Sequence, residues 1–336
     1  MLLPTPRGPL SAKLFVALHA NDPQGLPYAH QVPLIPDAVG DDDLQLCLWT
    51  CYELHYLGFD DVSDDWEWQP ELIAFRAALE NRMLDGLRRD VKVPWNEGTS
   101  IADQLWTLVG EDAGKSPARY LQRQATIAQF REYMMHRSIY QLKEADPHTW
   151  GIPRLSGRPK AALVEIQMDE YGNGELARMH SHLFTRVLRF LDIADGYGAH
   201  IESAPGITLA LSNVISMFGL HRALRGSLVG HLAAFEMNSS DPSRRISRGL
   251  RRIGADDGAC RFYDVHITAD SLHEQTAVYD LCGSLVESEP ELGEDILFGA
   301  AVSLHLEARF AEHVLGRWSL GESSLRHERP RALLAG

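Results

Sequence analysis

The sequence predicts an all-helical protein, on the basis of three observations. Apolar residues recur three and four positions apart through most of the chain, a spacing that places them on one face of an α-helix. Few segments alternate between apolar and polar residues, as a strand with one buried face does. Prolines and glycines fall mainly between the periodic segments, where they mark turns between helices.

The N-terminal 40 residues are rich in proline and glycine, and we expect them to form an extended lead-in. A helix over 43–57 begins with acidic residues, which suit the N-terminus of a helix. Further helices are expected over 69–90, 100–112, 117–144, 160–170, 175–194, 206–222, 224–237, 242–252, 258–282 and 292–316. We divide the chain into an N-terminal extension with accessory helices (1–115), a helical core (116–320) and a C-terminal tail (321–336).

The composition of the 336-residue chain, 45% hydrophobic and 23% charged, is that of an ordinary globular protein. A net charge of −14 disfavours binding to nucleic acid, which requires a basic face. We find neither a signal peptide nor an apolar run long enough to span a membrane. The cysteines form neither a disulfide framework nor a zinc pattern, so a reducing cytoplasm is expected; they are Cys47, Cys51, Cys260 and Cys282.

Three metal-binding residue types form a stripe on the helix predicted over 258–282. His266, Asp270 and His273 lie four and three positions apart, which is about one turn of helix at each step. Two imidazoles and a carboxylate suit iron or a similar divalent ion. For these three residues alone, a polar stripe facing solvent is the alternative.

Two further carboxylates end segments that are predicted to be helical. Glu236 follows the apolar run 228–235, where a buried charge would be costly without a partner. Glu144 ends the helix predicted over 117–144. A surface position is the alternative for both residues, and His148 competes with Glu144, although Pro147 breaks the helical register between them.

A third segment carries Glu170 and His180 on either side of Gly172 and Gly174. Glycine weakens a helix, so we expect metal binding to order this segment. His182 would point away from His180 on a helix. Other carboxylates could take the place of Glu170; they are Glu165, Asp169 and Glu175.

Four carboxylates and three imidazoles exceed what one ion needs and are about right for two. An oxygen-rich set of donors favours iron or manganese over copper. Chain order alone does not assign the donors to individual ions.

The sequence resembles the haem-oxygenase-like diiron oxidases and oxygenases, often described as iron-containing redox enzymes. The resemblance extends over roughly residues 130–300 and rests on the segments 142–150, 164–174, 178–180, 218–226, 230–236 and 262–273. It implies a haem-oxygenase-like helical bundle that binds two iron ions and O2, and no haem. The implied metal ligands are Glu144, Glu170, His180, Glu236, His266, Asp270 and His273.

The intervals between these residues, 26, 10, 56, 30, 4 and 3 positions, are similar to those of the family's N-oxygenase branch. The resemblance therefore implies a monooxygenase of biosynthesis that oxidises a small amine or amino acid to a hydroxylamine, with further oxidation to nitroso or nitro left open. Oxidative C–C cleavage of a fatty acid or amino acid is the second expectation. An external electron donor and a homodimer are also left open.

Three other classes of protein are alternatives. A haem enzyme would need one axial histidine and room for a porphyrin, and a crowd of carboxylates would fit such a pocket poorly. A ferritin-like protein is disfavoured because no Glu in the chain has a His three residues later. A non-catalytic helical interaction protein is the alternative from outside the enzymes, and it would bind no iron. Glu53-Leu-His55 lies upstream of the resemblance and has no role in this interpretation.

Overall fold

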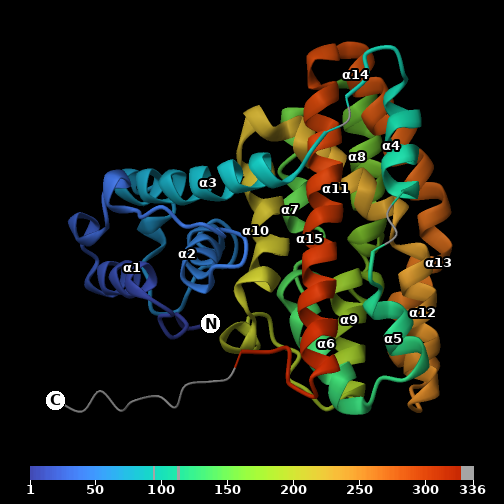
Figure 1. Cartoon of the computed structure of the whole chain (residues 1–336), viewed down its shortest axis with the longest axis horizontal. Helices are drawn as coiled ribbons and strands as arrows, with labels where there is room; N and C mark the ends of the chain where they lie inside the picture. The colour runs from blue at the N-terminus through green and yellow to red at the C-terminus, as the bar shows by residue number, and fades with distance from the viewer. Residues whose placement is uncertain (94, 112–113, 327–336) are drawn as a thin grey trace.

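The structure, a computed structural model, describes residues 1–93, 95–111 and 114–326, apart from the side chains of residues 268–272. Every regular element among these residues is a helix, and none of them forms a strand, so the predicted all-α class is confirmed. The helices form an upright bundle with a smaller group of helices on one side (Figure 1).

Most helices of the bundle lie close to the predicted ranges, but the two short helices α7 and α14 fall outside them. They are α4 (Ile101–Gly110), α5 (Pro117–Arg123), α6 (Ile127–Gln141), α7 (Asp146–Thr149), α8 (Gly157–Glu170), α9 (His180–Phe190), α10 (Gly206–Leu220), α11 (Arg225–Met237), α12 (Ser240–Arg252), α13 (Asp257–Gln275), α14 (Ser284–Ser288) and α15 (Gly293–Ser319). A π-helical segment, Thr276–Gly283, joins α13 to α14.

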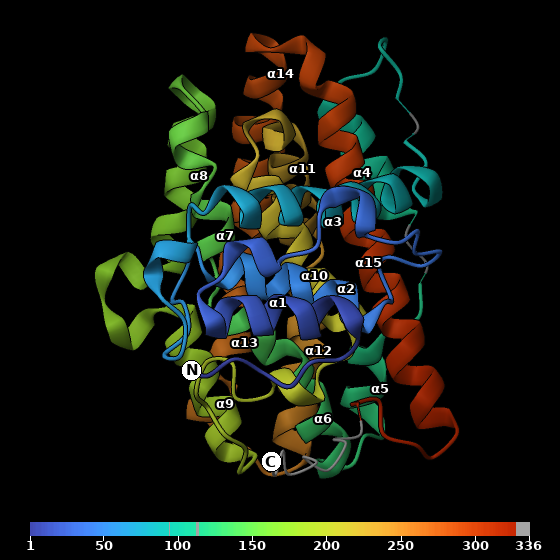
Figure 2. The ribbon, with the colours of Figure 1, turned by 90° about the vertical axis from the view of Figure 1, so that its left-hand side faces the viewer.

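The side group consists of α1 (Pro9–Ala20), α2 (Asp42–Glu53) and α3 (Pro70–Asp90), which lie beside α10 (Figures 1 and 2). Asp41 caps α2 by accepting a hydrogen bond from the Leu44 N–H, and acidic residues fill its first turn, as expected. The predicted extended lead-in is wrong over residues 9–20. There a proline at the first helical position starts α1, which buries apolar side chains such as Leu14 against α2.

The helix predicted over 117–144 is divided into α5 and α6. Thr126 starts α6 with a capping box: its hydroxyl accepts from the Gln129 N–H, and the Gln129 side chain accepts from the Thr126 N–H. The second helix ends at Gln141, so residues 142–145 form a turn before α7. Glu144 therefore lies in a turn and does not end a helix as predicted.

The helices α11 and α15 cross with their backbones nearly touching. A Cβ atom added at Gly230 would lie 1.8 Å from the Ile296 carbonyl oxygen, and one at Gly299 would lie 1.9 Å from that of Ser227. Only glycine permits this approach on both sides. The crossing fixes the position of α11, which carries Glu236.

No single helix in the described part of the chain is long and apolar enough to cross a membrane. The pair Gly206–Leu220 and Arg222–Met237 meets that condition only when both are taken together, and the two are bent by 109°. All four cysteines are buried free thiols.

Candidate metal centre

Glu144 reaches the interior of the bundle from the turn between α6 and α7. Backbone hydrogen bonds hold this turn: the Lys143 N–H donates to the Tyr140 carbonyl over 2.8 Å, and the Asp146 N–H donates to the Lys143 carbonyl over 2.9 Å. Leaving the helix at Gln141 directs Glu144 inward, where its side chain is buried.

Glu170 and His180 meet at the junction of α8 and α9. The first helix ends at Glu170 and the second begins at His180, with two short 3₁₀ turns between them. Gly172 has a φ of +61°, and a Cβ there would lie 2.5 Å from the Met179 nitrogen. The glycine thus lets the chain fold back tightly, which brings His180 Nδ1 to 2.8 Å from Glu170 Oε2.

The other described donors come from α11 and α13. Glu236 lies one residue before the end of α11, while His266 and His273 lie on the same face of α13. His266 Nε2 is 3.8 Å from Glu144 Oε1, and His273 Nδ1 is 3.5 Å from Glu236 Oε2.

These six residues form two overlapping groups of potential metal donors. Donor atoms of Glu144, Glu170, His180 and His266 all lie within 4.8 Å of one another, and the same holds for Glu170, Glu236 and His273. Glu170 belongs to both groups. Each of the six residues is at most 7% exposed. The structure therefore brings together six of the seven predicted residues; the side chain of the seventh, Asp270, lies outside the described residues.

The imidazole rings of His266 and His273 are each oriented by a hydrogen bond at the ring nitrogen that faces away from the cluster. His266 Nδ1 lies 2.7 Å from the Phe262 carbonyl oxygen. A carbonyl can only accept, so Nδ1 carries the proton and Nε2 presents its lone pair. His273 Nε2 lies 3.0 Å from Asp169 Oδ2, which leaves Nδ1 on the side of Glu236. Carboxylates and carbonyls often orient metal-binding histidines in this way.

From the sequence, Asp169 is expected only as a rival of Glu170. Its partner His273 is 104 positions away, so no local pattern could indicate the contact. His182 is partly exposed while His180 is buried, as expected for a single inward-facing histidine. His148 is buried behind the centre, with its Nδ1 3.4 Å from the Tyr140 hydroxyl and its Nε2 3.4 Å from His231 Nδ1.

The electrostatics of the cluster are those of buried groups held close together. Burial raises the pKa of Glu236, and the charge of Glu170 raises it further against the opposing effect of His273. Burial, together with neighbouring His180, lowers the pKa of His266 to about 4. Burial also lowers the pKa of His273, but Glu236 outweighs this effect and raises it to about 9.

Several buried atoms of the cluster lie close to an oppositely charged group but form no hydrogen bond of good geometry among the described residues. They include Glu170 Oε2, His180 Nδ1 and His273 Nδ1. Buried polar atoms without partners are rare and costly in folded proteins. A cation that accepts lone pairs would satisfy all three atoms, and carboxylate and imidazole donors suit iron. The residues present thus fit an iron centre.

Comparison with known proteins agrees with this chemistry. A family described as iron-containing redox enzymes matches residues 131–308, which is more than half of the chain. The chain belongs to this family. All six clustered residues of this iron-containing redox enzyme lie inside the matched range. No curated protein matches the chain.

Among solved structures, the enzyme is similar to a domain of unknown function with a heme oxygenase-like fold from Shewanella denitrificans OS217. The two are 15% identical with a TM-score of 0.49, and the match covers 68% of this chain and 94% of the other.

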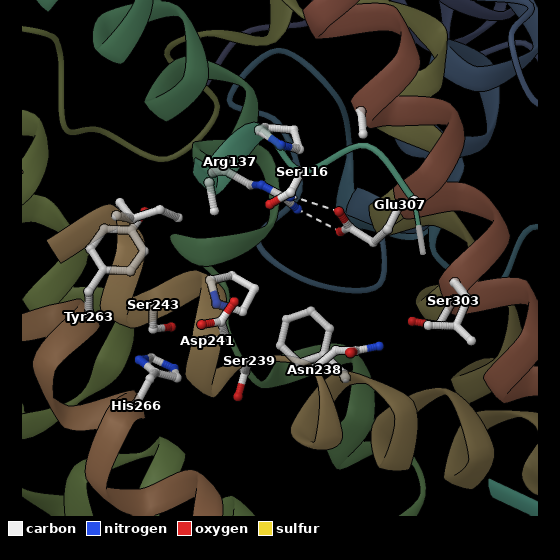
Figure 3. Close-up of a pocket in the computed structure, with 18 of the residues that line it drawn as sticks. Ser116, Arg137, Asn238, Ser239, Asp241, Ser243, Tyr263, His266, Ser303 and Glu307 are labelled. Atoms are coloured by element: carbon white, nitrogen blue, oxygen red, sulfur yellow. Dashed lines mark hydrogen bonds and ion pairs between the residues drawn. The ribbon is translucent and has the colours of Figure 1, made fainter. Parts of the chain in front are cut away.

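A pocket of about 330 Å³ adjoins the cluster, and Glu144 and His266 form part of its wall. Figure 3 shows Arg137 and Glu307 on the opposite side of this pocket from His266. Arg137 donates two hydrogen bonds of 2.7 Å to the two oxygens of Glu307 and lies over the ring of Phe310. Polar groups are concentrated at the C-terminal end of α11 and the start of α12; they are Asn238, Ser239, Asp241 and Ser243.

Proposed function

We propose that this protein is a non-haem diiron oxygenase that uses O2 to oxidise the nitrogen of a small amine-bearing substrate. The observation that supports two ions is the position of Glu170 in both groups of donors, since one carboxylate can then serve two neighbouring ions. Iron bound there would supply the redox chemistry for reducing O2.

The geometry suggests an assignment of donors to the two ions. Glu144, His180 and His266 would hold one ion together with Glu170. Glu236 and His273 would hold the other, again with Glu170. Asp270 joins this set on the spacing of the sequence, because it follows His266 by one turn of the same helix.

The chain's own residues would bind and orient the substrate. The pocket is large enough for a small molecule and reaches Glu144 and His266, so a substrate held in it would have its reacting atom beside the centre. The side chain of Glu307 is 37% exposed and faces this pocket, so it can accept a hydrogen bond from an amine. Phe235, Phe262 and Tyr263 line the same pocket, and the centre of the Phe262 ring lies 4.6 Å from that of His266, so aromatic surface would face a substrate held beside the centre.

The choice of amine oxidation over C–C cleavage rests on the spacing of the predicted ligands, which is similar to that of N-oxygenases. The same pocket and donors would serve either reaction, so the products must distinguish them.

The first test measures iron before any substrate is known. The metal-free protein is titrated with Fe(II) without oxygen, the bound iron is measured, and O2 is then admitted. We expect about two ions per chain and a transient visible absorption band when O2 is added. Glu170→Gln serves as the control, because it should weaken both ion positions. A wild-type protein that retains no iron would instead support a non-catalytic interaction protein.

The second test identifies the reaction. The iron-loaded protein is given O2, a reductant and a panel of amines and amino acids, and the products are analysed by mass spectrometry. Products that gain oxygen on nitrogen support the proposal. Products that lose carbon would replace it with oxidative C–C cleavage.

A further inference from the structure

Glu53 is a buried acid of the N-terminal region that pairs with Lys143, the residue before Glu144. It is the last residue of α2 and lies outside the range matched by the family. Its side chain is fully buried and forms an ion pair with the ammonium group of Lys143, which is itself only 5% exposed. A buried charge is costly unless it is paired, so each of these two residues depends on the other.

Three aromatic and polar contacts fix the pair. The Tyr197 hydroxyl donates to Glu53 Oε1 over 2.5 Å. The ammonium group of Lys143 lies 4.5 Å from the centre of the Tyr56 ring. The Tyr56 hydroxyl lies 3.0 Å from Ser216 Oγ on α10. The pair is therefore held both by the side group of helices and by the bundle.

Lys143 precedes Glu144 in the turn between α6 and α7. The side chain of Lys143 points to Glu53, whereas that of Glu144 points to His266. Residues 142–145 are not part of a helix, so the few backbone hydrogen bonds of the turn hold them in place of a helical ladder. The ion pair of Lys143 with Glu53 is thus one of the contacts that determine the position of Glu144.

We infer that Glu53 is a positioning residue for the metal centre and acts on Glu144 through Lys143. This inference rests on the proposed function, because it assumes that Glu144 binds a metal ion. The N-terminal region then completes a centre whose predicted ligands all lie in the bundle. Partners that orient metal ligands typically change metal affinity by about 10-fold to 100-fold when they are removed.

Cobalt(II) binding tests the inference without any turnover. The metal-free protein is titrated with Co(II), and its visible absorption reports both affinity and ligand geometry. The first variant is Glu53→Gln. Its matched control is Glu80→Gln, which alters another buried acid of the same helical group. Glu80 accepts a hydrogen bond from the Tyr52 hydroxyl and contacts His221, and neither Tyr52 nor His221 is next to a predicted metal ligand in the sequence.

We expect Glu53→Gln to weaken Co(II) binding about 10-fold or more and to alter the absorption band. We expect Glu80→Gln to lower the unfolding temperature while leaving the titration within about 2-fold of the wild type, because Glu80 does not contact the turn. Equal Co(II) affinity and equal spectra in Glu53→Gln and wild type would overturn the inference, whereas a wild type that binds no Co(II) would overturn the metal centre itself.

A double variant, Glu53→Met with Lys143→Met, covers the case in which Glu53→Gln does not fold. Replacing both members of a buried ion pair by apolar residues is often tolerated, so this protein should fold. A positioning role predicts that its Co(II) affinity is still lowered about 10-fold. Wild-type affinity and spectrum in the double variant would show that the pair only joins the two parts of the molecule.

Discussion

Glu170 is the residue on which the two groups of donors converge. Burial raises the pKa of its carboxyl, but His180 and the other imidazoles outweigh this effect and hold the pKa below its ordinary value, so the group is an anion at neutral pH. A buried carboxylate that remains charged can bind a cation without first losing a proton. Glu170 should therefore matter more for iron content than any donor that belongs to a single group.

We predict that Glu170→Ala reduces retained iron from about two ions per chain to less than one, whereas Glu236→Ala retains about one. The measurement is iron per chain after loading and desalting. Glu175→Ala is the matched control, because Glu175 lies between Glu170 and His180 in sequence but is exposed to solvent. Two ions retained by Glu170→Ala would contradict the shared position of this carboxylate.

His136 offers a prediction about pH that is independent of the metal centre. Its ring is buried, with Nδ1 2.7 Å from the Thr208 hydroxyl and Nε2 3.0 Å from that of Ser324. Burial, and to a lesser extent the nearby His313, lowers the pKa of His136 from 6.5 to about 3. The folded protein thus takes up this proton less readily than the unfolded chain. The resulting stability is fully present above about pH 6.5 and is lost as the pH falls toward about 3.

We predict that this residue accounts for about 2–3 kcal/mol of the stability lost between about pH 7 and pH 4.5. Urea unfolding of the metal-free protein at both pH values measures the loss. His136→Gln is less stable at neutral pH but loses less stability on acidification, since its amide does not titrate. The same loss in the variant and the wild type would show that His136 does not contribute.

At the scale of elements, the crossing of α11 and α15 controls where Glu236 stands. Replacing glycine by alanine inside a helix usually stabilises it by about 1 kcal/mol. Here the sign should reverse, because the added methyl group at Gly230 or Gly299 would collide with the backbone of the facing helix.

We predict that Gly230→Ala and Gly299→Ala each destabilise the protein by about 3 kcal/mol or more. Gly316→Ala, on the exposed side of α15 with open space around it, should stabilise by up to about 1 kcal/mol. Chemical denaturation of the three variants measures the differences. A stable Gly230→Ala protein would mean that the two helices can separate without cost.

At the scale of the whole molecule, α10 is covered from two sides. The bundle packs on one side, and α2 packs on the other (Figures 1 and 2). Polar contacts cross the second interface: the Asn213 side chain donates to the Gln45 carbonyl oxygen over 2.8 Å, and the Gly206 N–H donates to Asp42 over 2.5 Å. Asn213 is buried, so removing α2 would expose both apolar surface and the partners of these contacts.

We predict that a chain lacking residues 1–92 does not form a stable monomer, although residues 1–115 were expected to be an accessory extension. Size-exclusion chromatography and circular dichroism should show an aggregated or non-cooperatively unfolding protein. A monodisperse helical product with a cooperative thermal transition would show that the core over 116–320 folds alone.

Much of this molecule follows from local patterns that are visible in the chain. Helical periodicity determines the all-α class, because apolar residues three and four positions apart must share a face. The same geometry places His266 and His273 on one side of a helix, and the glycines after Glu170 mark the turn that precedes His180. The sequence could not show α1, which is only 12 residues long and adjoins a proline-rich segment.

Tertiary structure alone decided which distant residues meet. Glu170 lies within reach of donors from α9, α11 and α13, Asp169 pairs with His273, and Glu53 pairs with Lys143 across 90 positions. No periodicity encodes such contacts, because they depend on how whole helices pack and on a few close approaches such as Gly230 with Ile296. The sequence determined which residues are potential donors and which helix faces carry them, and packing determined that six of these residues meet in one buried cluster.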